Sequence, residues 1–396
     1  MTGSLLRGRV LATAGIVLVA LNMRTAVAAL SPLVSMIRAE FDMSTWVIAT
    51  LGMIPPLCYG VFGVLSGRIA RRFGLERTLL WAVVAIASGT FGRALVHAPM
   101  TLLAWTTVLF AGIGVGNVLL PPLVKKYFPD RIGLMTTIYV TMFAIGNVIP
   151  PLVAIPVADV VGWRFSVGMW AATAGIAVVP WVFLLRAHRR DGAPVGLGVA
   201  PDGFKPWHSS TTWAILALFF CSGFNSYALF AWMPQILADR AEVTGAASGA
   251  LLSLYASLGF PLGLVIPVLV ARFQLERFLV LAALGLYAVG YGGLLLAPTA
   301  ALALWVVCAA AGTLTFAASL TLINLRTHSP TTATATSSFV QGVGYSTVAV
   351  GVLGFGVVHS VSGGWDAPLI YAFVCSLVLI PAAIVLGRRQ FIDEPV

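Results

Sequence analysis

The chain has 396 residues, of which 59% are hydrophobic and only 9% are charged. Soluble globular domains carry about 25% charged residues, so a chain this apolar needs lipid rather than water around most of its surface. The composition therefore excludes a soluble enzyme or a soluble nucleic-acid-binding domain, although the formal net charge of +10 would suggest the latter.

Apolar runs separated by charged or Pro/Gly-containing turns predict the secondary structure. A helix needs about 20 apolar residues to cross the hydrocarbon core of a bilayer. Runs of suitable length occur, in chain order, at residues 12–37, 45–70, 78–96, 101–124, 132–158, 164–185, 212–238, 244–271, 276–297, 300–324, 334–360 and 366–387. We therefore predict an all-α integral membrane protein with twelve transmembrane helices.

A long polar stretch from Arg186 to Ser210 divides the chain almost in half and is typical of a linker. We predict three parts from it: an N-terminal six-helix bundle at 1–185, a cytoplasmic linker at 186–211 and a C-terminal six-helix bundle at 212–396.

The first apolar run permits a second interpretation, which is a cleaved signal peptide. Arg7 and Arg9 precede the run, and Ala26–Ala28 resembles a cleavage site. The apolar character resumes as far as Ile37, however, and removal of the run would leave an odd number of helices with an inverted charge bias. We expect the run to be retained as the first span.

The positions of the basic residues predict the topology. With the N-terminus inside, most of the 23 Lys and Arg residues fall in cytoplasmic segments, including Lys125, Lys126 and Arg131 in one loop. The predicted external segments hold Arg38, Arg93, Arg164 and Arg240. Because cytoplasmic loops of membrane proteins collect Lys and Arg, we expect a multi-pass protein of the cytoplasmic (inner) membrane with both termini in the cytoplasm.

An internal repeat relates the two halves. The six residues beginning at Arg72, RFGLER, recur as RFQLER from Arg272, each time after the second helix of its half. Gly162-Trp163 is echoed by Gly364-Trp365, and Pro32 by Pro234. Two pseudo-symmetric six-helix halves in parallel orientation are typical of transporters that work by alternating access around a site near the membrane midplane.

Arg24 is the charged residue nearest the middle of a predicted span. An arginine at that depth costs at least about 3 kcal/mol unless it faces water or a partner. The thirteen Asp and Glu residues all lie in loops or near helix ends, so we expect the partner to be a small anionic or strongly polarised solute bound by the guanidinium fork. The structural alternative is that Arg24 binds carbonyl and amide groups and fixes helix packing.

Other polar or aromatic residues at mid-depth are candidates to complete a substrate pocket. They are Asn22, Tyr59, Asn117, Tyr139, Asn225, Tyr255, Gln341 and Tyr345. The alternative for each is a bond to a neighbouring helix, worth about 0.6 kcal/mol. Asp, Glu and His, which usually relay protons in proton-driven pumps, are missing from the centres of the spans. This weighs against a proton relay, and the coupling mode stays open between protons, uniport and anion exchange.

Catalytic and metal-binding patterns are missing from the sequence. The four cysteines lie in apolar segments without ligand spacing, and no HExxH motif or nucleophile constellation occurs. We expect no enzymatic activity, no cofactor and no metal. The expected partners are a small-molecule substrate, the lipid bilayer and, as a candidate coupling ion, protons. We expect no nucleic acid and a monomeric chain.

The segment from Gly67 to Arg77 resembles the signature between helices two and three of the major facilitator superfamily, and the resemblance covers the whole chain. Arg71 departs from the signature, which usually has aspartate there. More narrowly, the chain resembles the cyanate permease and 2-nitroimidazole transporter family. The segments that carry this resemblance are Leu21–Arg24, Ala70–Arg77, Gly116–Pro121, Phe128–Arg131, Gly133–Thr136 and Gln341–Tyr345.

The resemblance implies a major facilitator fold and a small nitrogen-containing anionic or polar solute. It also implies a conformational role for the residues of the signature loop and its repeat, which are Gly67, Arg71, Arg72, Gly74, Arg77, Arg272, Glu276 and Arg277. We expect a secondary transporter that binds its solute through Arg24. The alternatives are a broad-specificity drug exporter, which would tolerate loss of Arg24, and a membrane nutrient sensor.

Overall fold

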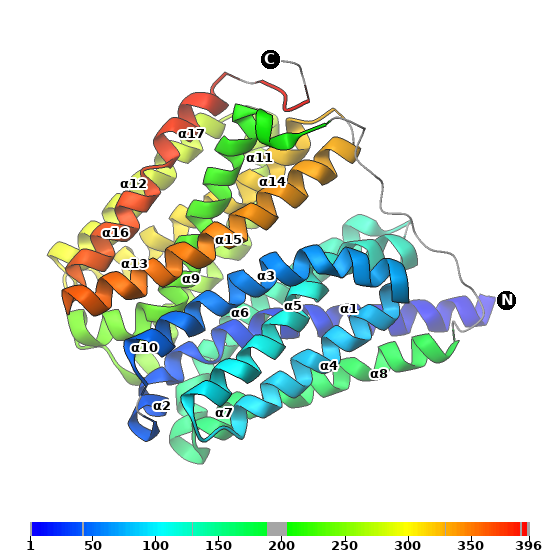
Figure 1. Ribbon diagram of the computed structural model, residues 1–396, viewed down its shortest axis with the longest axis horizontal. Helices are drawn as coiled ribbons and strands as arrows, with labels where there is room; N and C mark the ends of the chain where they lie inside the picture. Colours follow the sequence, from blue (N-terminus) through cyan, green and yellow to red (C-terminus); the bar gives the residue numbers. More distant parts are fainter. Residues whose placement is uncertain are drawn as a thin grey trace. The chain divides into compact units, whose positions relative to one another are not determined.

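The computed structural model describes residues 2–41, 43–128, 130–187, 204–328, 330–388 and 390–393, and every regular element among them is a helix (Figure 1). The prediction of an all-α protein is therefore confirmed. Most of the predicted linker, residues 188–203, lies outside the described residues. The chain divides into two compact units, one made of Met1–Met43 with Val61–Leu197 and the other of Ser44–Gly60 with Gly198–Val396.

The first unit is built on long helices. They are α1 (Thr2–Ala28), η1 (Ser31–Leu33), α2 (Val34–Glu40), the second half of α3 (Thr45–Phe73), α4 (Leu75–Ala94), α5 (Pro99–Tyr127), α6 (Ile132–Val161), α7 (Trp163–Gly168) and α8 (Trp170–Ala187). Helix α1 packs against α6 and α8, and α4 packs against α5 and α8 (Figure 1). Pro32 stands at the start of the 3-10 turn η1, which divides the predicted first span into α1 and α2.

Glycines allow the closest helix contacts in the first unit. A methyl group at Gly89 would lie 2.6 Å from Cβ of Leu109, and one at Gly92 would lie 2.2 Å from the ring of Trp105. Helices α4 and α5 can therefore approach this closely only because these positions have no side chain.

The second unit repeats this arrangement. It holds the first half of α3, then η2 (Pro206–His208), α9 (Ser210–Ala241), α10 (Gly245–Ser257), α11 (Gly259–Phe273), α12 (Glu276–Leu296), α13 (Leu302–Ala311), η3 (Gly312–Leu314), α14 (Thr315–Leu325), α15 (Pro330–Ser362), α16 (Asp366–Ser376) and α17 (Leu379–Leu386). A methyl group at Gly290 would lie 2.8 Å from the amide nitrogen of Ala309, and one at Gly293 would lie 2.1 Å from the ring of Trp305. The contact between α12 and α13 thus reproduces the one between α4 and α5.

Ten helices of the described chain are long and apolar enough to cross a membrane. The predicted spans at 12–37 and 78–96 are not among them. Helix α4, which contains most of the predicted span at 78–96, carries Glu76, Arg77 and Arg93. These charged residues make it less apolar than the ten helices that qualify. The total of twelve spans stays a prediction.

Candidate functional site

Arg24 lies at the contact between α1 and α6 in the first unit. Its guanidinium carbon is 5.0 Å from the centroid of the Phe143 ring, within the range of a cation–π interaction. The rings of Tyr139 and Phe143 make an edge-type contact, with ring centroids 5.4 Å apart. A methyl group at Gly146 would lie 2.5 Å from the carbonyl oxygen of Leu21, so α6 approaches α1 closely beside Arg24. These contacts form a half-buried cluster, which we call the Arg24 cluster, of Arg24, Tyr139 and Phe143.

The structure brings together two of the residues predicted for the site, Arg24 and Tyr139, and adds Phe143. Sequence reasoning missed Phe143 because one phenylalanine in an apolar span gives no signal of its own. The spacing of Tyr139 and Phe143 by four residues on one helix was the available clue, because residues four apart share a helix face.

Asn22 lies on a different face of α1 from Arg24. Two residues of helix correspond to a rotation of about 200°. The Asn22 side chain is buried; its Nδ2 donates to the Leu18 carbonyl oxygen over 2.8 Å, and its Oδ1 accepts from the Thr173 hydroxyl of α8 over 2.8 Å. Asn22 is thus bound within the unit and does not join the Arg24 cluster.

Asn117 on α5 is half-buried and follows Gly116, which packs against the Met23 side chain of α1. A methyl group at Gly116 would lie 3.3 Å from the terminal carbon of Met23. Asn117 therefore stands on the helix that covers another side of α1.

Three predicted site residues of the second unit lie on α3 and α15, beside aromatic side chains of α9. The ring of Tyr59 packs edge-on against Tyr345 at 5.4 Å and Tyr227 at 6.1 Å, and Tyr345 packs against Phe219 at 4.9 Å. Gln341 lies one turn before Tyr345 on α15, and its Nε2 donates to the Ser337 hydroxyl over 2.8 Å. The second unit thus has its own aromatic cluster with an amide beside it.

Asn225 and Tyr255 lie in the interior of the second unit. Asn225 is fully buried and its Nδ2 donates to the Cys221 carbonyl oxygen over 2.7 Å and to the Ser376 hydroxyl over 3.1 Å, while its Oδ1 accepts from the Tyr291 hydroxyl. Tyr255 is buried, and its ring packs edge-on against Phe230 at 5.7 Å. These contacts hold helices of the unit together.

The loop after α3 and its repeat after α11 each lead into a buried acidic residue. Glu76 accepts from Lys126 Nζ over 2.6 Å and from the Tyr127 hydroxyl over 3.0 Å. In the repeat, Glu276 accepts from Arg326 Nη2 over 2.6 Å. The partners stand the same distance along the chain from their glutamates, so the repeat extends from the loop sequence to the ion pair.

The other residues predicted to have a conformational role in the loop and its repeat take no part in these two ion pairs. Arg72 lies over the Phe73 ring at 5.4 Å and Arg272 over the Phe273 ring at 5.8 Å. Gly74 has a positive φ of 88°, and its counterpart Gln274 a positive φ of 53°. Arg77 and Arg277 are exposed and Gly67 is half-buried. The Arg71 side chain lies outside the described part of the structure.

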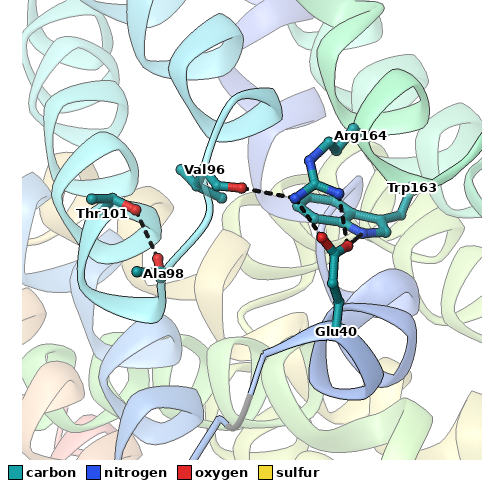
Figure 2. A network of polar contacts seen from close by, with 6 residues as sticks. All are labelled: Glu40, Val96, Ala98, Thr101, Trp163 and Arg164. Carbon is teal, nitrogen blue, oxygen red and sulfur yellow. Dashed lines mark hydrogen bonds and ion pairs between the residues drawn. The ribbon is translucent and has the colours of Figure 1, made fainter.

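Each unit also carries a cluster of polar contacts at the start of the helix that follows the repeated Gly-Trp. We call the first the Glu40 clamp (Figure 2). Glu40 accepts from the Trp163 indole Nε1 over 2.8 Å and from Arg164 over 2.6 and 2.7 Å, and Arg164 also donates to the Val96 carbonyl oxygen over 3.0 Å. The hydrogen bonds from Arg164, which have the largest effect, and from Trp163 lower the pKa of Glu40 below its ordinary value.

The second unit has an equivalent cluster with the charges exchanged, which we call the Asp239 clamp. Asp239 accepts from the Trp365 indole Nε1 over 2.8 Å. Arg240 pairs with Asp366 and donates to the Leu295 carbonyl oxygen over 3.2 Å. Both clamps therefore contain an indole N–H bonded to a carboxylate and an arginine bonded to a backbone carbonyl near a helix end. In the first unit the arginine of the ion pair follows the tryptophan in the chain, whereas in the second unit the acidic residue of the ion pair does so.

The sequence matches one large transporter family over most of its length. Residues 15–352 match the family model described as Major Facilitator Superfamily. The chain belongs to the major facilitator superfamily. Its members are transporters and not enzymes, so the chain is a multi-pass membrane transporter.

Three curated relatives narrow the comparison. The chain is 30% identical to the uncharacterized transporter YycB of Bacillus subtilis (strain 168), covering 96% of this chain and 94% of that protein. It is 27% identical to the 2-nitroimidazole transporter of Escherichia coli (strain K12), covering 97% of both chains. It is 26% identical to the cyanate transport protein CynX of the same organism, covering 92% of this chain and 94% of that protein. The resemblance to the cyanate and 2-nitroimidazole transporter family is confirmed.

A solved structure supports the fold independently. The crystal structure of a bacterial homologue of the human lysosomal transporter Spinster, in an inward-facing and unoccupied conformation, matches with a TM-score of 0.76. The match covers 98% of this chain and 99% of that chain at 14% sequence identity. The major facilitator fold is thereby confirmed, while this level of identity carries no information about the substrate.

Proposed function

We propose that this superfamily member is a secondary transporter that moves a small anionic or strongly polarised nitrogen-containing solute across the cytoplasmic membrane by alternating access. The main support is the Arg24 cluster. A half-buried arginine within a predicted span, beside an aromatic ring and about one turn before the end of α1 at Ala28, is typical of a residue that binds a polar solute.

The geometry of the Arg24 cluster fits such a solute. A guanidinium presents planar N–H donors that match carboxylate, nitro or cyanate groups. Phe143 and Tyr139 offer ring faces and edges on which a flat heterocycle can pack. The solutes in the names of two curated relatives have this chemistry. Cyanate is a small anion, and 2-nitroimidazole carries a nitro group on a flat ring.

Uptake by proteoliposomes tests the proposal. Labelled cyanate and a labelled 2-nitroimidazole would each be offered to wild type, Arg24→Lys and Phe143→Leu. Arg24→Lys keeps the charge but loses the fork, so we expect about a tenfold loss of uptake for both solutes. Phe143→Leu removes the ring, so we expect a larger loss for the nitroimidazole than for cyanate.

The same vesicles identify the coupling. Uptake that rises when the outside of the vesicles is more acidic than the inside would indicate proton coupling. Uptake that requires an anion loaded inside the vesicles would indicate anion exchange. Transport of uncharged drug-like solutes with neither cyanate nor nitroimidazole uptake would contradict the proposal and favour a broad-specificity exporter.

A further inference from the structure

An exposed apolar stripe runs along α12 of the second unit and ends in an arginine. Leu281, Gly285 and Ala288 follow Arg277 at intervals of four and three residues, which places them on one face of the helix. All four residues are exposed, and a methyl group at Gly285 would meet no described atom within 4 Å. Because α12 is apolar enough to cross a membrane, lipid chains cover this face and Arg277 stands at its end.

Helix α17 packs beside α12 and carries a second stripe (Figure 1). Ile380 and Ile384 are 43% and 54% exposed, and the exposed Arg388 follows the end of the helix. A methyl group at Gly387 would lie 3.4 Å from Cδ of Arg277. The side chain of Arg277 therefore reaches the end of α17 beside Arg388, and one apolar surface ends in two arginines.

Helices α4 and α8 form the same arrangement in the first unit, where they also pack side by side (Figure 1). On α4 the exposed Arg77 is followed by Trp81 and Val84, which are 50% and 46% exposed. On α8 Phe183 is 52% exposed and the exposed Arg186 follows it by three residues. Each helix thus has an outer apolar face with an arginine at one end.

The two arginines of the first unit lie at the same end of these helices. A methyl group at Gly168, just before α8, would lie 2.8 Å from Cβ of Ala94 at the end of α4. Arg77 stands 17 residues before Ala94, and Arg186 stands 18 residues after Gly168. At 1.5 Å per residue both arginines are about 26 Å along their helices from this contact. The helices are therefore antiparallel, with Arg77 and Arg186 together at the opposite end.

The four arginines belong to the internal repeat. Arg77 and Arg277 are 200 residues apart, as are the two copies of the signature loop. Arg186 and Arg388 are 202 residues apart, as are the two Gly-Trp pairs. A single arginine at the end of a span reaches the headgroup region without needing a specific partner. A pair at the same end of two packed helices, present in both units, indicates a built site.

The charge of these pairs is not neutralised within the described part of the structure. None of the ion pairs there includes any of the four arginines. The adjacent carboxylates, Glu76 and Glu276, are buried and already paired with Lys126 and Arg326. Two guanidinium groups without a carboxylate favour a phosphodiester that carries net negative charge, because the cationic group of a zwitterionic lipid would be repelled.

Aromatic residues place the first pair at the depth of the lipid headgroups. Trp81 stands one turn after Arg77, and its ring makes an edge-type contact with the exposed Phe73 at 5.0 Å. Tryptophan is enriched at the boundary between hydrocarbon and headgroups. The loops that join these helices are the ones predicted to be cytoplasmic, and the cytoplasmic leaflet is the one that carries anionic lipid.

We propose that the two arginine pairs, Arg77 with Arg186 and Arg277 with Arg388, are equivalent binding sites for one anionic phospholipid each. The phosphodiester accepts hydrogen bonds from the guanidinium groups, and the acyl chains lie along the apolar stripes. This inference goes beyond the proposed function, because it concerns the lipid around the protein and not the transported solute.

Native mass spectrometry of the purified full-length protein in a non-ionic detergent tests the sites without measuring transport. Dioleoyl phosphatidylglycerol and dioleoyl phosphatidylcholine would be titrated separately, since they differ only in the headgroup. We expect wild type to bind two molecules of phosphatidylglycerol more tightly than any phosphatidylcholine. The double variants Arg77→Gln/Arg186→Gln and Arg277→Gln/Arg388→Gln should each weaken one of the two sites by about thirtyfold and leave the other unchanged.

The matched control is Arg131→Gln/Lys205→Gln, which removes one exposed positive charge from a predicted cytoplasmic segment of each unit. It should keep both tightly bound lipids. Equal binding of phosphatidylcholine by wild type, an unchanged lipid count in both site variants, or an equal loss in the control would overturn the proposal. Displacement of phosphatidylglycerol by glycerol phosphate at the same concentration would also overturn it, because the arginines would then bind a water-soluble phosphate.

Discussion

At the scale of single residues, the two copies of the loop differ at one backbone position. Gly74 has φ 88° and ψ 157°, a conformation that is essentially restricted to glycine, whereas Gln274 lies in the left-handed helical region. A side chain at Gly74 would therefore strain the backbone, and removal of the side chain at Gln274 would relieve strain.

The expected result is an asymmetric exchange. Gly74→Gln should lower the free energy of unfolding by about 1–3 kcal/mol. Gln274→Gly should raise it by about 0.5–1 kcal/mol, because the strain that is relieved exceeds the added freedom of the unfolded chain. Thermal unfolding in detergent would measure both. Equal and opposite effects, or destabilisation by Gln274→Gly, would contradict this reading of the turns.

The two buried ion pairs should also differ in their contribution to stability. The side chains of Glu276 and Arg326 are 5% and 10% exposed, whereas Lys126 is 28% exposed and can turn to water when Glu76 is neutralised. We expect Glu276→Gln to cost about 3–5 kcal/mol, as for other broken buried pairs, and Glu76→Gln to cost about 1–3 kcal/mol. The exposed Glu242→Gln is the control. A larger loss of Tm in Glu76→Gln would contradict the assignment.

Residue-level sequence reasoning reached only part of these sites. Arg24 stood out because its charge lies in an apolar run, and its aromatic neighbour Tyr139 was among the candidates. Asn22 was grouped with Arg24 by depth, but a spacing of two on a helix puts it on another face. Asn225 bonds to Tyr291 and Ser376, which lie 66 and 151 residues away from it along the chain. Such contacts depend on packing and leave no local pattern.

At the scale of elements, the apolar runs predicted where helices occur but not where they break. The predicted spans at 164–185, 244–271, 300–324 and 366–387 are each divided by a non-helical residue or a short turn. Each of these four spans is apolar enough as a whole to cross a membrane, so length and composition give no warning of the breaks.

The two clamps give a prediction about how the helix ends are held. The triple variant Ala39→Asp, Glu40→Arg, Arg164→Asp copies the residues of the Asp239 clamp into the first unit. We expect it to recover most of the Tm lost by Glu40→Arg alone, because it restores the carboxylate for the Trp163 indole and the ion pair with exchanged charges. Thermal unfolding would test it. A triple variant less stable than Glu40→Arg would show that the clamps are not equivalent.

The pH dependence of the Glu40 clamp follows from the lowered pKa of Glu40. A carboxyl group whose pKa is lower in the folded state than its ordinary value of 4.5 stabilises the fold above that pH, and the stabilisation is lost as the pH falls through the folded pKa. The Tm difference between wild type and Glu40→Gln should therefore be constant from pH 7 to pH 5 and shrink below pH 4.5. A difference that grows in acid would contradict this.

At the scale of the whole molecule, the sequence predicted the fold class and the family because both depend on features spread over the chain. Apolar runs, basic loops and the repeat beginning at Arg72 and Arg272 needed no tertiary contact to be seen. The repeat proves more extensive than these motifs, since it includes the Glu76 and Glu276 ion pairs and the packing of Gly92 and Gly293. The division between the two units after Gly60, inside one continuous helix, was not visible in composition.

The central claim is that Arg24 binds the transported solute. The most direct measurement is the initial rate of labelled cyanate uptake by proteoliposomes that contain equal amounts of folded wild type, Arg24→Ala or Arg38→Ala. Arg38 is exposed at the end of α2 and serves as the matched control for loss of one positive charge. The account predicts that Arg24→Ala loses at least about a hundredfold in rate, the value expected when a charged hydrogen-bonding partner is removed, while Arg38→Ala stays within about twofold of wild type. Uptake by Arg24→Ala equal to that by Arg38→Ala would contradict it.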